Sequence, residues 1–248
     1  MNNFMSMNPM HQFHVYRIGP EIKFGGFDIS FTNSSLFMIV SGLAILFFLF
    51  LASQKKSIVP NKIQLISELS YEFVFKMISD TAGSKAKPYF PFIFTLFMFV
   101  LFCNMIGMLP YAFTVTSHII VTFILASIIF IGVTFIGFLK HGTRYLKLFV
   151  PSGVPIVLLP LIVVIEIISY LSRPVSLSVR LFANMMAGHT MLKVFGGFVV
   201  SLGLLGGWLP LSFSVALTGL EILVAFLQAY VFAILTCIYL NDALNLHH

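Results

Sequence analysis

The chain has 248 residues, of which 59% are hydrophobic and only 9% are charged, whereas soluble domains carry about 25% charged residues. A mean hydropathy of +1.02 leaves too few polar side chains to cover a water-soluble globule. This composition excludes a soluble enzyme, a disordered chain and a disulfide-stapled secreted domain, and it predicts an integral membrane protein. The net charge of +6 comes from basic residues in loops beside apolar spans, which favours membrane orientation over nucleic-acid binding.

Uncharged stretches predict where the chain crosses the membrane. No charged residue occurs between Asp28 and Lys55, or between Lys87 and Lys140. One membrane-spanning helix needs about 20 apolar residues, so the first stretch holds one span and the second holds two. Residues 1–12 contain no Lys or Arg and precede no apolar signal core, so the first span is expected to stay in the membrane.

These boundaries predict one all-α polytopic membrane domain over residues 1–248. The expected elements are a first span at 33–53, an amphipathic surface helix at 60–80, a transmembrane hairpin at 88–109 and 113–139 that turns near Pro110, and two long tilted helices at 154–205 and 210–242. The surface helix is inferred from apolar residues at helical spacing, namely Ile63, Ile66, Leu69, Phe73 and Met77.

Basic loops predict the orientation. The loops 54–87 and 140–147 are rich in Lys and Arg, whereas 111–117 carries no charge. By the positive-inside rule, the basic loops face the cytoplasm or matrix and the N-terminus faces the other side.

The last hundred residues place ionisable side chains inside apolar sequence. A charge at the bilayer centre costs at least about 2.5 kcal/mol, so these side chains are expected to line an aqueous or protein-covered cavity. We see no internal repeat of the kind that marks many secondary transporters. The residues concerned are Glu166, Arg173, Arg180, His189, Lys193 and Glu221.

Heptad spacing places several of these residues on shared helix faces. Glu166, Arg173 and Arg180 are seven apart, as are Glu221 and Gln228, so each series drifts by only about 20° per step. Pro174 is expected to bend the first helix, and Ala225, Ala229 and Ala233 form a stripe where helices can approach closely. For Arg173 and Lys193 we favour packing or snorkelling. For Arg180, His189 and Glu221 we favour an ion pathway.

The residue types indicate that the ion is a proton. An imidazole titrates near pH 6.5, and a buried carboxyl can hold a proton, so His189, Glu221 and Glu166 can pass protons. Arg180 stays charged and acts as a fixed positive charge. Cys103 and Cys237 lie in apolar runs and predict neither a disulfide nor a metal site, and no histidine pair has haem-ligating spacing.

Four segments resemble subunit a of F-type ATP synthases, particularly its alphaproteobacterial and mitochondrial members. They cover nearly the whole chain and are ISFTNS at 29–34, CNMIGMLP at 103–110, SLSVRLFANMMAGH at 176–189, and the tail with LEI at 220–222, QAY at 228–230 and YLND at 239–242. The resemblance implies a subunit beside a ring of c subunits, each with a mid-membrane carboxylate, together with peripheral stalk subunits of the b type and membrane lipid. It implies an inner-membrane location in a bacterium or mitochondrion, and no cofactor, metal or nucleic acid.

The resemblance also assigns roles. Arg180 corresponds to the essential arginine between two offset half-channels. His189, Asn184, Glu221 and Gln228 correspond to the external-side half-channel. Glu166, Tyr170 and Asp242 correspond to the inner side, although Asp242 could instead cap the chain at the surface. In many bacteria the acid and histidine of positions 189 and 221 are exchanged, which suggests that they act as a pair.

One alternative stays open from the sequence alone. A stand-alone proton-coupled transporter or channel could use the same buried charges, and it would enclose its substrate cavity within this chain. The sequence contains no phosphate-binding glycine loop, so the chain is not expected to be an enzyme by itself, and ATP chemistry is expected on other subunits.

Overall fold

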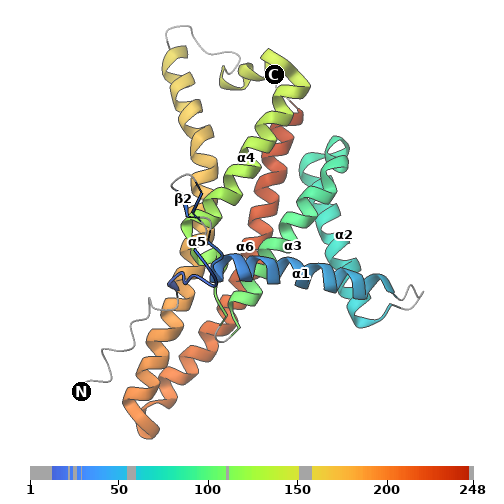
Figure 1. Cartoon of the computed structure of the whole chain (residues 1–248). Coiled ribbons are helices and arrows are strands. Elements are labelled where there is room, and N and C mark those ends of the chain that lie inside the picture. Colours follow the sequence, from blue (N-terminus) through green and yellow to red (C-terminus); the bar gives the residue numbers. More distant parts are fainter. Residues whose placement is uncertain are drawn as a thin grey trace. The chain divides into compact units, whose positions relative to one another are not determined.

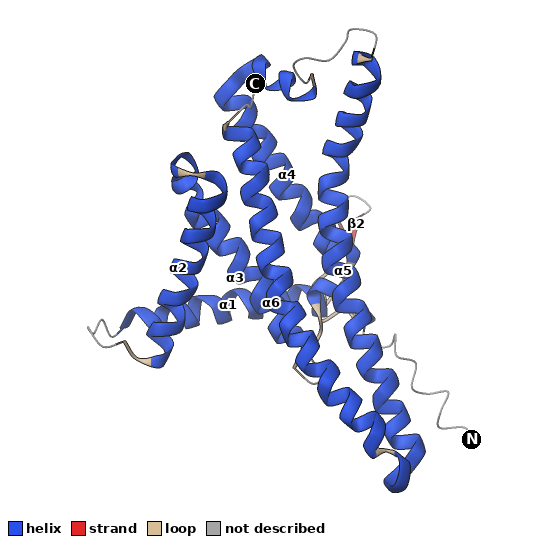
Figure 2. Ribbon diagram, turned by 180° about the vertical axis from the view of Figure 1, so that it is seen from behind, coloured by secondary structure: helices blue, strands red, loops and turns tan. Residues whose placement is uncertain are grey.

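The computed structural model describes residues 13–21, 23–24, 27–28, 30–54, 60–109, 112–150 and 158–245. Within these ranges the chain is almost wholly helical (Figures 1 and 2), which confirms the predicted all-α class. A two-residue antiparallel pair, β1 (Lys23–Phe24) and β2 (Phe27–Asp28), precedes the helices. The α-helices are α1 (Asn33–Gln54), α2 (Lys62–Ala82), α3 (Phe90–Gly107), α4 (Ile119–His141), α5 (Leu159–Gly206) and α6 (Trp208–Leu244), and the 3-10 helices are η2 (Ser84–Tyr89), η3 (Val115–Ser117) and η4 (Gly142–Phe149).

Five helical segments of the described chain are long and apolar enough to cross a membrane. They are Asn33–Gln54, Ser84–Gly107, Ile119–Leu146, Leu159–Gly203 and Trp208–Leu244. Large apolar side chains on these segments point outward, as at Leu46 and Phe47 of α1, which are 65% and 63% exposed. Apolar surface of this extent is unfavourable in water and favourable against lipid chains, so the chain is an integral membrane protein.

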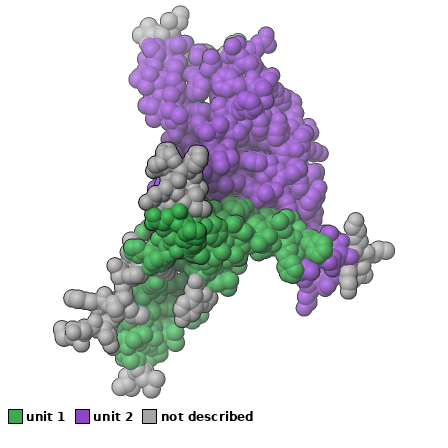
Figure 3. All heavy atoms as spheres, in the orientation of Figure 1, with its two compact units in different colours: residues 1–50, 98–118, 181–229 green, residues 51–97, 119–180, 230–248 purple. Residues whose placement is uncertain are grey.

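The chain divides into two compact units, which Figure 3 colours separately. The first unit contains residues 1–50, 98–118 and 181–229, and the second contains 51–97, 119–180 and 230–248. Helices α5 and α6 are each divided between the two units, so the predicted site residues are distributed over both units.

In the first unit, the end of α5 and the start of α6 form a helical hairpin (Figures 1 and 2). The chain reverses at Gly203, whose φ of 60° favours glycine, and Gly207 N donates to Gly203 O at 2.8 Å. A Cβ at Gly207 would lie 2.6 Å from that oxygen, so the turn has no room for a side chain. Phe195 stacks on Phe213 across the hairpin with ring centroids 6.0 Å apart.

In the second unit, α2 is an amphipathic helix that packs only part of its apolar face. The Asn61 side chain caps it by accepting from Lys62 N at 2.8 Å. Val74 and Ile78 are fully buried, whereas Ile66, near the helix start, is 55% exposed. The unpacked apolar residues suit a membrane surface, and that location stays a prediction.

Helix α5 passes through Pro174 without a break. Gly203 is the only described residue of α5 with non-helical backbone angles, so the helix continues through Pro174, and the bend expected there stays a prediction. Proline removes one backbone donor, and helical structure persists in hydrocarbon because no water is available to the other backbone groups. Residues 154–157 and Pro110, which entered the predicted boundaries, lie outside the described residues.

Candidate functional site

A buried acid–base pair lies in the first unit. Glu221 of α6 is only 5% exposed, and its Oε1 lies against Nδ1 of His189 of α5, whose side chain is 11% exposed. The hairpin turn sets this register, because it brings the facing sides of α5 and α6 together. The structure therefore joins the two residues that the sequence suggested as a pair.

The second nitrogen of His189 defines the protonation of the ring. Nε2 lies 2.9 Å from the carbonyl oxygen of Gly107 and 2.9 Å from Oγ1 of Thr114. A carbonyl oxygen only accepts hydrogen bonds, so Nε2 carries a proton. Nδ1 and the Glu221 carboxyl group can then share one further proton, either as imidazolium and carboxylate or as imidazole and carboxylic acid. The pair can thus hold one exchangeable proton.

Glu221 also has an oxygen that is open to a new partner. Its Oε2 is buried and makes no hydrogen bond within the described part of the chain. A buried carboxylate oxygen without a donor costs free energy, so this atom is suited to accept a proton or a water molecule.

An amide pair lies on the same two helices. Asn184 of α5 donates through Nδ2 to Oε1 of Gln228 of α6 at 3.0 Å. Gln228 is 3% exposed, and its Nε2 has no hydrogen-bond partner among the described residues. All four residues predicted for one half-channel are therefore in two contacting pairs of one unit.

Sequence reasoning missed two residues, Asn104 and Thr116, that link α3 to α6 and to η3 within this unit. Asn104 is fully buried, donates to the carbonyl oxygen of Ala225 at 3.2 Å, and accepts from Thr116 Oγ1 at 2.8 Å. Ala225 is also fully buried, as predicted for the small-residue stripe. The available signal was an amide inside an otherwise apolar run, because such a side chain needs a buried partner.

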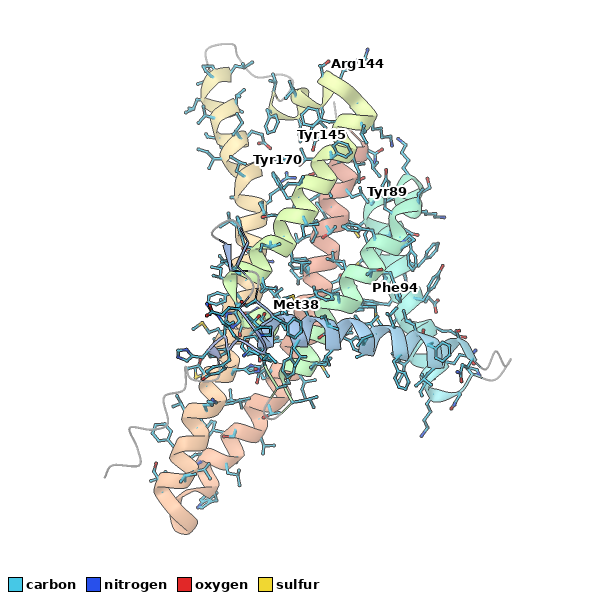
Figure 4. All side chains as sticks on the ribbon, viewed as in Figure 1. Met38, Tyr89, Phe94, Arg144, Tyr145 and Tyr170 are labelled. Carbon is cyan, nitrogen blue, oxygen red and sulfur yellow. The ribbon has the colours of Figure 1, made fainter. Side chains whose placement is uncertain are left out.

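The second unit holds a chain of three hydroxyl groups. Tyr170 of α5 contacts Thr134 Oγ1 of α4 at 2.6 Å and the hydroxyl of Tyr145 in η4 at 3.0 Å, and Figure 4 labels the two tyrosines side by side. Tyr145 is 1% exposed and Tyr170 is 8% exposed. Hydroxyl groups both donate and accept, so this chain can support a hydrogen-bonded path.

Asp242 forms an ion pair with Arg173 in the second unit. Its Oδ2 accepts from Nη1 of Arg173 at 3.1 Å. The Arg173 guanidinium also lies over the rings of Tyr170 and Tyr239, 5.2 Å and 5.0 Å from their centroids. Ion pairing and cation–π contacts together hold this arginine in place, which agrees with the packing role favoured for Arg173.

Arg180 and Glu166 make no hydrogen bond or ion pair with the described residues of their own unit. Arg180 is exposed and Glu166 is half-buried. Glu166 lies one helical turn before Tyr170. An exposed arginine within a span has a high free-energy cost against lipid.

No group of three or more His, Cys, Asp or Glu side chains in the described ranges is arranged to hold a metal ion. His118 lies between two spans and stacks on Phe113 with ring centroids 4.9 Å apart, and burial lowers its pKa.

The fold and these clusters define a polytopic α-helical membrane protein with ionisable side chains paired inside its spans. A sequence profile for the family described as ATP synthase A chain matches residues 35–241. The chain therefore belongs to the ATP synthase A chain family.

Several relatives match over almost their full length. ATP synthase subunit a of Pelagibacter ubique (strain HTCC1062) is 83% identical over 244 residues, which cover 98% of this chain and 100% of the relative. ATP synthase subunit a of Chelativorans sp. (strain BNC1) is 60% identical, with 98% and 100% covered. ATP synthase subunit a of Mesorhizobium japonicum is 58% identical, with 98% of both chains covered.

Proposed function

We propose that this chain is the proton-translocating subunit of the membrane sector of an F-type ATP synthase, and that it couples proton flow to rotation of a ring of c subunits. His189, Glu221, Asn184 and Gln228 line the half-channel on the external side. A membrane potential supplies about 2.3 kcal/mol per charge per 100 mV, and this chain converts the passage of each proton into a step of the ring.

The observation that carries the proposal is the His189–Glu221 pair. The pair is buried inside a span, can hold one exchangeable proton, and leaves Glu221 Oε2 open to a donor. A packing role alone gives no reason for this arrangement, because an unpaired buried carboxylate oxygen destabilises the fold. A role as a proton acceptor inside a span explains why this carboxylate oxygen is left without a donor.

Arg180 is proposed to act on the carboxylate of a c subunit. It is exposed and makes no ion pair with the described residues of its own unit, and its guanidinium stays charged. At a separation of 4 Å and an effective dielectric of 20, it attracts a carboxylate by about 4 kcal/mol. This attraction favours the ionised ring carboxylate, and it is weak enough to release it. The fixed charge also opposes a direct proton leak.

Glu166, Tyr170 and Asp242 are proposed to serve the half-channel on the inner side. The hydroxyl chain around Tyr170 supports this assignment, as does the presence of Tyr170 and Asp242 in contact with one Arg173. In the proposed orientation the N-terminus lies on the external side and the basic loops face the cytoplasm or matrix. Stalk subunits of the b type complete the membrane sector, and ATP chemistry takes place on other subunits.

ATP-driven acidification of inverted membrane vesicles tests the proposal. We expect Glu221→Gln and Arg180→Ala each to abolish acidification in complexes that contain normal amounts of this chain and of the ring-forming subunit after detergent purification. Glu72→Gln is the matched control, because Glu72 is an exposed carboxylate on α2. Normal acidification in assembled Arg180→Ala and Glu221→Gln complexes contradicts the proposal.

A further inference from the structure

The carbonyl oxygen at the end of α3 collects two hydrogen-bond donors. Gly107 is the last residue of α3, and the last carbonyls of a helix have no partner within it. Gly107 O accepts from Thr114 Oγ1 at 3.1 Å and from His189 Nε2 at 2.9 Å. Thr114 Oγ1 in turn lies 2.9 Å from the same nitrogen, so the three atoms form a closed triangle.

The single hydroxyl proton of Thr114 determines how this triangle is ordered. When Thr114 donates to Gly107 O, its oxygen lone pairs face Nε2 of His189, and the Nε2 proton can be shared by both oxygens. Because Nε2 keeps its proton in this arrangement, Nδ1, which lies against Glu221 Oε1, is the ring nitrogen that can exchange a proton.

We propose that Thr114 is a positioning residue for the proton step at His189 and Glu221. It holds the imidazole ring with Nε2 protonated towards Gly107, so that Nδ1 is presented to the carboxyl group. This inference rests on the proposed function, and it adds a residue from the segment between α3 and η3 to the machinery. Without the hydroxyl, Nε2 keeps one acceptor in place of two, and the ring gains freedom to rotate about its broad terminal torsion.

The same segment contains a matched control. Thr116 is 3% exposed, as is Thr114, but its hydroxyl donates to Asn104 Oδ1 at 2.8 Å and not to His189. Replacing either threonine by valine removes one buried hydroxyl at nearly constant volume. Only the change at Thr114 removes an acceptor from Nε2.

The test compares proton pumping by assembled complexes in inverted vesicles. Thr114→Val is expected to reduce the rate about five-fold, which corresponds to one hydrogen bond of about 1 kcal/mol. Thr114→Ser keeps the hydroxyl and is expected to stay within about two-fold of the unmodified chain, as is Thr116→Val. A residue that only fills space gives the opposite order, with valine tolerated and serine impaired, and that order overturns the inference.

Two further measurements separate a failure of the Thr114 inference from a failure of the proposed function. If Thr114→Val does not assemble, Thr114→Ala is compared with Thr114→Ser, and equal rates overturn the inference. Glu221→Gln is measured in parallel: normal pumping by this variant overturns the proposed function itself. Loss of pumping in Glu221→Gln together with normal pumping in Thr114→Val overturns only the positioning role of Thr114.

Discussion

Gly188 of α5 lies beside the Glu221 carboxyl group. A Cβ built at this position would lie 2.7 Å from Glu221 Oε1 and 3.0 Å from its Cδ. Ordinary contacts begin at 3.4 Å, so Gly188→Ala displaces the carboxyl group by about 0.7 Å from its position beside His189. The change is otherwise favourable for the helix, since alanine exceeds glycine in helix propensity by about 1 kcal/mol.

This displacement predicts a functional defect without a folding defect. A misplacement of about 1 Å at a reacting group can cost on the order of 100-fold, so we expect Gly188→Ala to lower the rate of ATP-driven acidification at least ten-fold. The amount of this chain in detergent-purified complexes should be unchanged. Gly196→Ala is the control, because Gly196 lies in the same helix and a Cβ there meets no atom within 4 Å. Equal pumping by the two assembled variants would refute the geometry described for Glu221.

Two other predictions concern the second unit. Tyr145→Phe removes the hydroxyl that contacts Tyr170 at 3.0 Å and should slow pumping about five-fold. Tyr170→Phe should slow pumping more, because Tyr170 has a second hydroxyl partner. Equal pumping rates for the two variants would count against the hydroxyl chain. Asp242→Ala leaves Arg173 without its carboxylate and should lower the temperature at which detergent-purified complexes lose this chain. The double change Arg173→Met with Asp242→Leu should restore most of that temperature, since apolar residues can replace an ion pair at little cost, and no recovery would contradict this.

The sequence predicts the helical architecture well because hydrocarbon permits few alternatives. Every backbone group in a span must be paired internally, so uncharged stretches translate directly into helices. Pro174 shows that a local helix breaker need not end a span, because α5 continues through it. The periodicity of α2 predicts an apolar face along the whole helix but does not show which part of that face is packed. Only the second half of α2 buries side chains such as Val74 and Ile78.

Site prediction depended on chemistry that stands out in apolar sequence. His189, Glu221 and Gln228 are conspicuous because ionisable and amide groups are rare inside spans. Thr114 and Tyr145 were missed because hydroxyl residues are common in turns and spans, and only their three-dimensional partners distinguish them. The ion pair of Arg173 with Asp242 was also missed, because heptad counting within each helix gives no register between two helices.

The length of the glycine turn from Gly203 to Gly207 sets the register of α5 against α6 in the hairpin. The contacts of His189 with Glu221 and of Asn184 with Gln228 lie at nearly equal sequence distances on either side of it. One residue of helix corresponds to a rotation of about 100° and a rise of about 1.5 Å. A change of one residue in the length of this turn therefore points the polar face of α6 away from its partners, although the turn itself contains no ionisable group. The two side-chain pairs thus constrain the spacing of this turn as well as the chemistry of the residues that it aligns.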